Sequence, residues 1–256
     1  ISKKTKMIFV ETPTNPMMTI SDIKKISSLS KKNNILFVVD NTFMSPYFQR
    51  PIEFGADISI HSTTKYIGGH SDIIGGLVVV KDDERILEDL KFIQMSVGAI
   101  PGPFDCWLTQ RSIKTLPVRM EKHNDNAIEL AKILNHSNKI EEVFYPGLKT
   151  HPQNTLAKTQ HLNPNGQYGY GGMISIKFSN LQTAKKFVKN LSIFTLAESL
   201  GGVESLVCHP STMTHASMPK ELREQIGITE GLIRLSVGIE DIEDLKDDIN
   251  YALKAI

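Results

Sequence analysis

Residues 57–72, Asp57-Ile-Ser-Ile-His-Ser-Thr-Thr-Lys-Tyr-Ile-Gly-Gly-His-Ser-Asp72, give the strongest indication of how the chain folds. Its first half alternates apolar and polar residues, which predicts a short strand over 58–62. Three hydroxyl residues, Ser62, Thr63 and Thr64, lie at the carboxyl end of that strand, and Lys65 follows them directly. Open α/β sheets bind ligands at the carboxyl ends of their strands, and hydroxyl groups there suit an anion. Glycine pairs at 68–69 and 75–76 predict that the backbone passes close to something bulky, such as a cofactor.

Further buried strands are predicted on both sides of this stretch. Short apolar runs over 7–11, 35–40 and 77–80 are typical of buried parallel strands, and a helical repeat over 20–29, with Ser21 as candidate cap, separates the first two. Strands joined by helix-length connections predict an α/β fold with a mainly parallel sheet. Acidic, amide, hydroxyl and amine groups would then share one edge of that sheet, as in a cofactor site.

The second half of the chain predicts a smaller α+β domain. Residues 84–134 have a mostly helical pattern with a break at 98–103, and Cys106 and Ile113 are expected in the core. A helix from 119 to 134 is expected to bridge two domains, which places residues 1–117 in a large domain and 118–256 in a small one. The later elements are predicted as strands at 142–145, 173–178 and 232–237, and helices at 181–190 and 242–255.

Composition excludes several classes of function. Lys plus Arg (29) nearly balance Asp plus Glu (28), so no basic surface for nucleic acid is expected. No apolar run has the length needed to span a membrane. Two distant cysteines, Cys106 and Cys208, favour a reducing, cytoplasmic location, and the histidines show no metal-ligand spacing. The chain starts without methionine, and an upstream portion is expected to be absent from it.

Several ordered motifs together resemble one enzyme family. They are Val39-Asp40-Asn41-Thr42, Ser62-Thr-Thr-Lys65-Tyr66, Glu198-Ser-Leu-Gly-Gly202, Arg234-Leu-Ser-Val-Gly238, Glu11-Thr-Pro-Thr-Asn-Pro16, Met44-Ser-Pro-Tyr-Phe-Gln-Arg50 and Met213-Thr-His-Ala-Ser217. The sequence is similar to the pyridoxal-phosphate enzymes of cysteine and methionine metabolism, and most to cystathionine γ-lyases. The resemblance implies the fold-type I architecture and pyridoxal 5′-phosphate as cofactor. It also implies a homotetramer with shared active sites, and a large domain whose upstream part lies outside the chain.

In that resemblance, Lys65 forms the covalent bond to the cofactor aldehyde and moves protons during catalysis. A surface lysine is the structural alternative. Asp40 would pair with the protonated ring nitrogen, although an acid at a strand end also caps helices. Ser62 and Thr64 would donate hydrogen bonds to the phosphate, or serve only as turn hydroxyls. Asn15 would contact the phenolic oxygen of the ring, or be a plain turn residue before Pro16.

The remaining candidates concern the substrate. Arg234 lies in the middle of an apolar strand, so its charge requires a carboxylate partner, either the substrate α-carboxylate or an acid of a structural salt bridge. Ser199 would assist through backbone or hydroxyl contacts. In the family, a glutamate at the position of Glu198 accompanies enzymes that act on the γ-carbon of cystathionine, whereas a solvated loop acid is the alternative.

The predicted activity is therefore a carbon–sulfur lyase of transsulfuration. It would cleave L-cystathionine by γ-elimination to cysteine, 2-oxobutanoate and ammonia, with release of hydrogen sulfide from cysteine as a side activity. Cystathionine γ-synthase and cystathionine β-lyase use the same groups and remain alternatives. The alternative of another class is a non-catalytic paralogue or interaction subunit.

Overall fold

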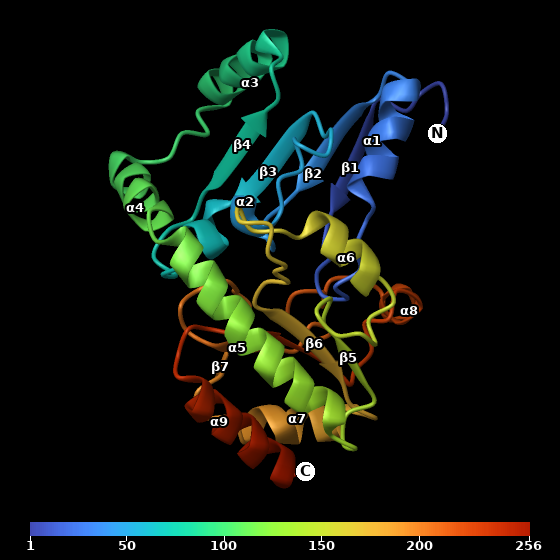
Figure 1. The fold of residues 1–256 in the computed structure, drawn as a ribbon, viewed down its shortest axis with the longest axis vertical. Coiled ribbons are helices and arrows are strands. Elements are labelled where there is room, and N and C mark those ends of the chain that lie inside the picture. Colours follow the sequence, from blue (N-terminus) through green and yellow to red (C-terminus); the bar gives the residue numbers. More distant parts are fainter.

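The computed structural model describes all 256 residues, and its two β-sheets are connected by one long helix (Figure 1). The first sheet has the order β1-β2-β3-β4 and the second the order β5-β6-β9-β8-β7. Helix α5 (Leu116–His136) starts beside the first sheet and extends along the second. Its bridging position agrees with the long helix predicted from the sequence.

The first sheet is α/β in type and mainly parallel. Its strands are β1 (Met7–Glu11), β2 (Leu36–Asp40), β3 (Ile58–Ser62) and β4 (Gly76–Val80). Strands β1, β2 and β3 pair in parallel, whereas β4 pairs with β3 in antiparallel register. The prediction of burial was wrong for the two edge strands, because Phe9 is 55% and Val78 46% exposed.

Helix α1 (Ile23–Lys32) connects β1 to β2 and packs on this sheet through Ile23, which contributes to a small core with Phe37 and Val39. The Asp22 side chain caps the helix by accepting a hydrogen bond from the Lys25 N–H at 3.0 Å. The sequence-based choice of Ser21 as cap was therefore one residue too early. A short helix, α2 (Ser45–Phe48), follows β2.

Helices α3 (Glu84–Val97) and α4 (Pro103–Ile113) lie outside the core (Figure 1). Cys106 is exposed and Ile113 is 38% exposed, so their predicted burial was wrong. Helix α3 has no buried residue, and Trp107 on α4 stacks on Phe104 at 5.7 Å between ring centroids while both rings remain exposed. An apolar helical repeat predicts burial only where a neighbouring element covers it.

The second sheet forms the larger core. Its strands are β5 (Glu142–Phe144), β6 (Met173–Lys177), β7 (Thr195–Leu196), β8 (Leu206–Cys208) and β9 (Leu232–Ser236). Helices α5, α7 (Leu181–Lys189) and α9 (Ile242–Lys254) contribute buried residues to this core, whereas α8 (Lys220–Gln225) contributes none. A third, nine-residue cluster that includes Phe43, Tyr66 and Leu200 joins residues of both halves.

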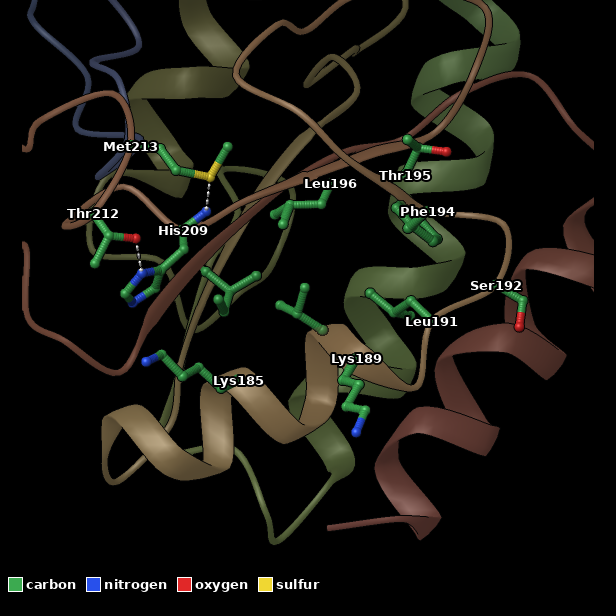
Figure 2. A pocket seen from close by; sticks show the side chains of 12 residues that line it. Lys185, Lys189, Leu191, Ser192, Phe194, Thr195, Leu196, His209, Thr212 and Met213 are labelled. Carbon is green, nitrogen blue, oxygen red and sulfur yellow. Dashed lines mark hydrogen bonds between the residues drawn. The ribbon is translucent and has the colours of Figure 1, made fainter.

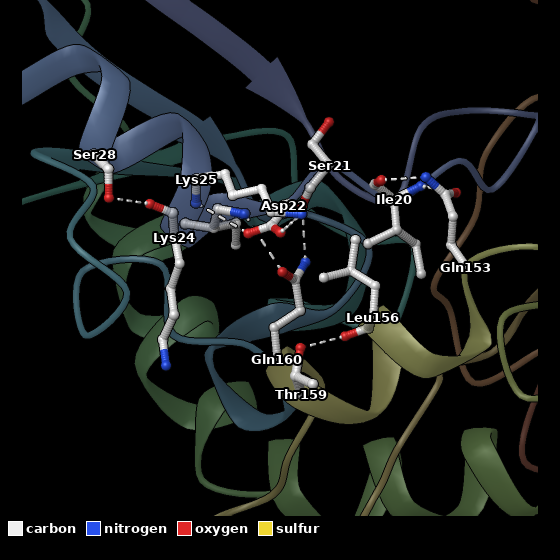
Figure 3. Close-up of polar contacts among 11 residues, drawn as sticks. Ile20, Ser21, Asp22, Lys24, Lys25, Ser28, Gln153, Leu156, Thr159 and Gln160 are labelled. Carbon is white, nitrogen blue, oxygen red and sulfur yellow. Dashed lines mark hydrogen bonds and ion pairs between the residues drawn. The ribbon is translucent and has the colours of Figure 1, made fainter.

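Helix α6 (Asn154–Gln160) reaches back from the second half to the segment that follows β1 (Figure 3). The Gln153 side chain accepts a hydrogen bond from Ile20 N–H at 2.7 Å and donates one to Ile20 C=O at 2.6 Å. Gln160 donates to Ser21 C=O at 3.1 Å. Two amides spaced seven residues apart thus hold the loop that carries Asn15, which matters for the site below. None of the helices combines the length and apolarity needed to cross a bilayer.

Candidate active site

Lys65 lies at the carboxyl end of β3, as predicted. It is in a five-residue π-helical turn, η1 (Thr63–Ile67), but departs from helical geometry with φ −93° and ψ −131°. The side chain is half-buried and takes part in none of the seven ion pairs of the structure. Burial, and the positive charge of Arg234, lower the pKa of Lys65 below its usual value. An amine with a lowered pKa is the form of lysine that attacks carbonyl carbons.

Asp40 ends the neighbouring strand β2, on the same edge of the sheet. One of its carboxylate oxygens accepts a hydrogen bond from the Thr42 N–H at 3.0 Å, and no cationic side chain of the chain pairs with it. The Thr42 hydroxyl in turn accepts the Ser62 N–H at 2.9 Å, which ties the end of β2 to the end of β3. Asp40 caps a turn and still has an oxygen available for a cation.

The two predicted phosphate ligands differ in availability. Ser62 is half-buried, its backbone N–H donates to the Thr42 hydroxyl, and its own hydroxyl forms no hydrogen bond. The Thr64 hydroxyl accepts the Gly75 N–H at 3.0 Å and lies 3.4 Å from the Gly75 carbonyl. Ser62 is thus the freer of the two hydroxyls.

The glycines of this stretch contact protein atoms. A Cβ at Gly69, where φ is +71°, would lie 2.2 Å from the Arg119 guanidinium, and one at Gly75 would lie 2.7 Å from the Thr63 hydroxyl. The predicted close approach is found at Gly69 and Gly75, and there it is made by protein side chains; a cofactor near these glycines stays a prediction. They allow close packing of the turn that carries Lys65.

Arg234 on β9 is the buried charge at the centre of the site, with 1% of its surface exposed. It donates hydrogen bonds to Asn15 Oδ1 at 2.9 Å, Glu198 C=O at 2.7 Å and Ser199 C=O at 3.1 Å. Its Nε is buried without a partner, and no carboxylate lies within ion-pair distance. The alternative of a structural salt bridge was therefore wrong. Neutral acceptors leave the charge uncompensated.

Asn15 joins the two halves of the site. Its N–H donates to Glu11 Oε2 at 3.0 Å, and its side-chain oxygen accepts from Arg234, which leaves the amide NH₂ free to donate. Glu11 pairs with Asp40 in the β1–β2 register. Burial raises the pKa of Glu11, while the Asn15 N–H lowers it and nearby Asp40 raises it further. The structure thus brings Asn15, Asp40 and Arg234 into one neighbourhood.

Glu198 and Ser199 reach Arg234 through their backbone carbonyls. The Ser199 residue is half-buried, whereas the Glu198 side chain is exposed and forms no ion pair. The loop then packs on the lysine turn at Gly201, where φ is +76° and a Cβ would lie 2.9 Å from Tyr66 N. Val203 N–H donates to Gly69 C=O at 2.9 Å. This loop connects Arg234 on the second sheet with Lys65 on the first.

Arg119 is a residue that the sequence reasoning missed. It is 4% exposed and donates hydrogen bonds to the carbonyls of Tyr66 at 2.6 Å, Ile67 at 3.1 Å and Ser112 at 3.0 Å. A cation at the carboxyl end of the η1 turn satisfies carbonyls that have no partner within the turn. Arg119 therefore holds the turn that positions Lys65. An arginine in the first turn of a helix gives no sequence signal for this role.

Replacing Arg119 by methionine is expected to lower the free energy of unfolding by about 3 kcal/mol, because three buried carbonyls lose their donor. Urea unfolding measures this as a lower midpoint with an unchanged slope. Arg111→Met is the matched control, since Arg111 is exposed on the neighbouring helix α4. Equal midpoints for the two variants would show that Arg119 does not support the turn.

Comparison with known proteins identifies the family. A family model described as Cys/Met metabolism PLP-dependent enzyme matches residues 1–254. The chain belongs to this family. The resemblance seen in the sequence motifs is thereby confirmed, as is the fold class, and the cofactor of the family is pyridoxal 5′-phosphate.

Relatives within the family carry different activities in their names. The chain is 53% identical over 252 residues to the cystathionine beta-lyase of Lactococcus lactis subsp. cremoris (strain MG1363), covering 98% of the chain and 64% of that protein. It is 50% identical over 256 residues to the cystathionine gamma-lyase of Bacillus subtilis (strain 168), covering 100% and 66%. The solved cystathionine gamma synthase of Xanthomonas oryzae pv. oryzae in complex with aminoacrylate and cysteine is 45% identical, with a TM-score of 0.93 and coverage of 98% and 63%.

The chain thus spans about 64% of the length of the first of these curated relatives. The residues it contains fit the family cofactor on three observations. Lys65 offers an amine without an ionic partner, Asp40 a carboxylate oxygen without one, and Ser62 a free hydroxyl at the same sheet edge. No cluster of three His, Cys, Asp or Glu side chains has the arrangement of a metal site.

Proposed function

We propose that this protein is a pyridoxal-phosphate-dependent carbon–sulfur lyase that cleaves L-cystathionine by γ-elimination to cysteine, 2-oxobutanoate and ammonia. One combination of features carries the proposal. The amine of Lys65 has a lowered pKa, and the buried guanidinium of Arg234 has no carboxylate partner. An α-amino acid supplies the missing carboxylate. Glu198 before Ser-Leu-Gly-Gly supports the γ-position.

In the proposed site, each side chain has one task toward the cofactor or substrate. When bound, pyridoxal phosphate supplies an electron sink for the bond that breaks at the α-carbon. Asp40 would hold the proton of the ring nitrogen, the Asn15 amide would donate to the ring oxygen, and the Ser62 hydroxyl to the phosphate. Thr64 would join Ser62 by turning its hydroxyl hydrogen from the Gly75 carbonyl, 3.4 Å away, to the phosphate.

Arg234 would bind the substrate α-carboxylate and orient the scissile bond. The two carbonyls of Glu198 and Ser199 fix the guanidinium plane before substrate arrives. Lys65, once free of its covalent bond, would accept the α-proton and then move a proton from Cβ while the Cγ–S bond breaks. The departing sulfur takes up a proton to give cysteine. The lowered pKa of Lys65 favours the neutral amine that this first step needs.

A second candidate function is the β-lyase reaction, which gives homocysteine, pyruvate and ammonia. The 53% identity to a protein named cystathionine beta-lyase favours it. The γ-synthase reaction, in which cysteine replaces an activated substituent of homoserine, is supported by the 45% identical synthase structure. All three reactions need the same lysine and carboxylate clamp.

Product analysis separates these functions. The chain is supplied with pyridoxal phosphate and L-cystathionine, and we expect 2-oxobutanoate and cysteine as the main products. If the products are pyruvate and homocysteine, the protein is a β-lyase and the γ-lyase proposal is wrong. Turnover only with an O-acylated homoserine and cysteine would indicate the synthase. The Lys65→Ala variant is the control, and equal product formation by that variant would contradict all three.

Assembly and location follow the same family reasoning. We propose a cytoplasmic homotetramer with active sites shared between subunits, acting in cysteine biosynthesis and methionine metabolism, with hydrogen sulfide release from cysteine as a side reaction. The exposed, stacked rings of Phe104 and Trp107 support an interface on α4, because solvent-facing apolar side chains of this size favour association.

A further inference from the structure

A cavity of about 730 Å³ lies in the second half of the chain, between helix α7 and the edge strand β7 (Figure 2). Its volume is in the range of sites that bind small organic molecules. Twelve residues line it: Lys185, Val188, Lys189, Leu191, Ser192, Phe194, Thr195, Leu196, His209, Thr212, Met213 and Ile233. None of them belongs to the candidate active site.

The cavity is on the opposite side of the second sheet from Arg234. Ile233 and Arg234 are consecutive on β9, and successive side chains of a strand point to opposite faces. Ile233 belongs to the large core beneath α5, α7 and α9, whereas Arg234 contacts Asn15 and the loop at Glu198. A ligand in this cavity would therefore occupy a second, separate site.

The floor and one wall are apolar and held in place. Ile233 is fully buried and Phe194 is 3% exposed, whereas Leu196 at the mouth is 55% exposed. The wall at residues 192–194 is fixed by the buried carboxylate of Asp248, which accepts the N–H groups of these three residues at 2.7, 3.0 and 3.2 Å. Asp248 itself is not among the residues that line the cavity, and its oxygens face these backbone N–H groups. An ordered apolar floor suits an apolar ligand body.

The rim is positively charged. Lys185 and Lys189 are four residues apart on α7, both line the cavity, and neither forms an ion pair (Figure 2). Figure 2 shows the two side chains extending in different directions, and because both are exposed, each is free to turn toward an anion at the rim. No aspartate or glutamate lines the cavity. His209 offers no binding group, because its ring nitrogens already lie 2.7 Å from the Thr212 hydroxyl and 2.8 Å from the Glu230 carbonyl.

We propose that this cavity is a binding site for a small amphipathic monocarboxylate. Its apolar body would lie on Phe194, Leu196 and Ile233, and its carboxylate between Lys185 and Lys189. Lysine ammonium groups bind a single carboxylate as point charges, and they lack the planar fork that favours bidentate binding. The apolar floor favours an organic anion over an inorganic one, and the two cations favour a carboxylate over a neutral head group.

Octanoate is the probe, and isothermal titration calorimetry on the full chain is the measurement. We expect one octanoate per chain, and about fivefold weaker binding for the double variant Lys185→Ala, Lys189→Ala. Lys186→Ala is the matched control, because Lys186 is on the same helix but does not line the cavity. Octanol binding should be equal in all three proteins. Absence of octanoate binding, or equal octanoate affinity in all three, would overturn the proposal.

A second variant tests the position of the site. Leu196→Asp places a negative charge at the mouth on a side chain that is already 55% exposed, so folding should be retained and octanoate binding lost. Circular dichroism checks the fold. Excess L-cystathionine should not displace octanoate, because the active-site arginine is on the other face of the sheet. Displacement, or undiminished binding by Leu196→Asp, would place octanoate elsewhere and contradict the proposal; neither result depends on the lyase reaction.

Discussion

Replacing Lys65 by alanine is expected to abolish the absorption band of covalently held pyridoxal phosphate and to lower the rate of cystathionine cleavage by at least about 10³-fold. The reason is that both the covalent attachment and the proton transfers are assigned to this one amine. Absorption spectra and product formation measure the two effects. Because Lys65 is half-buried and lacks an ionic partner, its loss should change the free energy of unfolding little.

Lys81→Ala is the matched control for this prediction. Lys81 is exposed and follows β4, which runs antiparallel to β3, so it lies at the opposite edge of the first sheet from Lys65. The control should keep both the band and the rate. A Lys65→Ala protein with an unchanged band would show that another lysine holds the cofactor, and the site as described would be wrong.

The Arg234→Met variant is expected to raise KM for cystathionine by about 100-fold while the cofactor band persists. Arg234 contacts no residue assigned to covalent attachment, and its uncompensated charge is the group proposed to bind the substrate carboxylate. Arg234→Lys should recover only part of the affinity, since an ammonium cannot reproduce the planar contacts to two carbonyls and Asn15. Steady-state kinetics and spectra measure both.

Loss of the band together with the affinity would give Arg234 a structural role instead. Three acceptors lose their donor in the methionine variant, so some loss of stability is expected as well. A urea midpoint measured alongside KM distinguishes a structural role of Arg234 from a role in substrate binding. If stability falls but KM for cystathionine does not change, the guanidinium does not bind the substrate.

The strand positions and the lysine turn could be predicted because each depends on local sequence. Buried apolar runs followed by polar residues fix β2 and β3, and with them Asp40 and Lys65. The direction of β4 could not be obtained in this way. Parallel pairing of β3 and β4 would need a crossover connection of a dozen or more residues, usually a helix. The connection over 63–75 instead contains the η1 turn and a loop, and it returns the chain in the antiparallel direction.

The residues that support the site were beyond sequence reasoning for a different reason. Arg119 meets three carbonyls, and Gln153 meets the backbone of Ile20, only after distant segments have packed together. Neither residue type shows its partner in the local sequence. The burial of Arg234 was predictable from its apolar strand, but its acceptors at Asn15 and the carbonyls of Glu198 and Ser199 required the fold.

Borohydride reduction followed by peptide mass spectrometry shows which lysine holds the cofactor. Reduction makes the lysine–cofactor bond permanent, so the modified residue can be located. We expect a single pyridoxyl group, on Lys65, in the chain incubated with pyridoxal phosphate. A modification found on another lysine, with Lys65 unmodified, would contradict it.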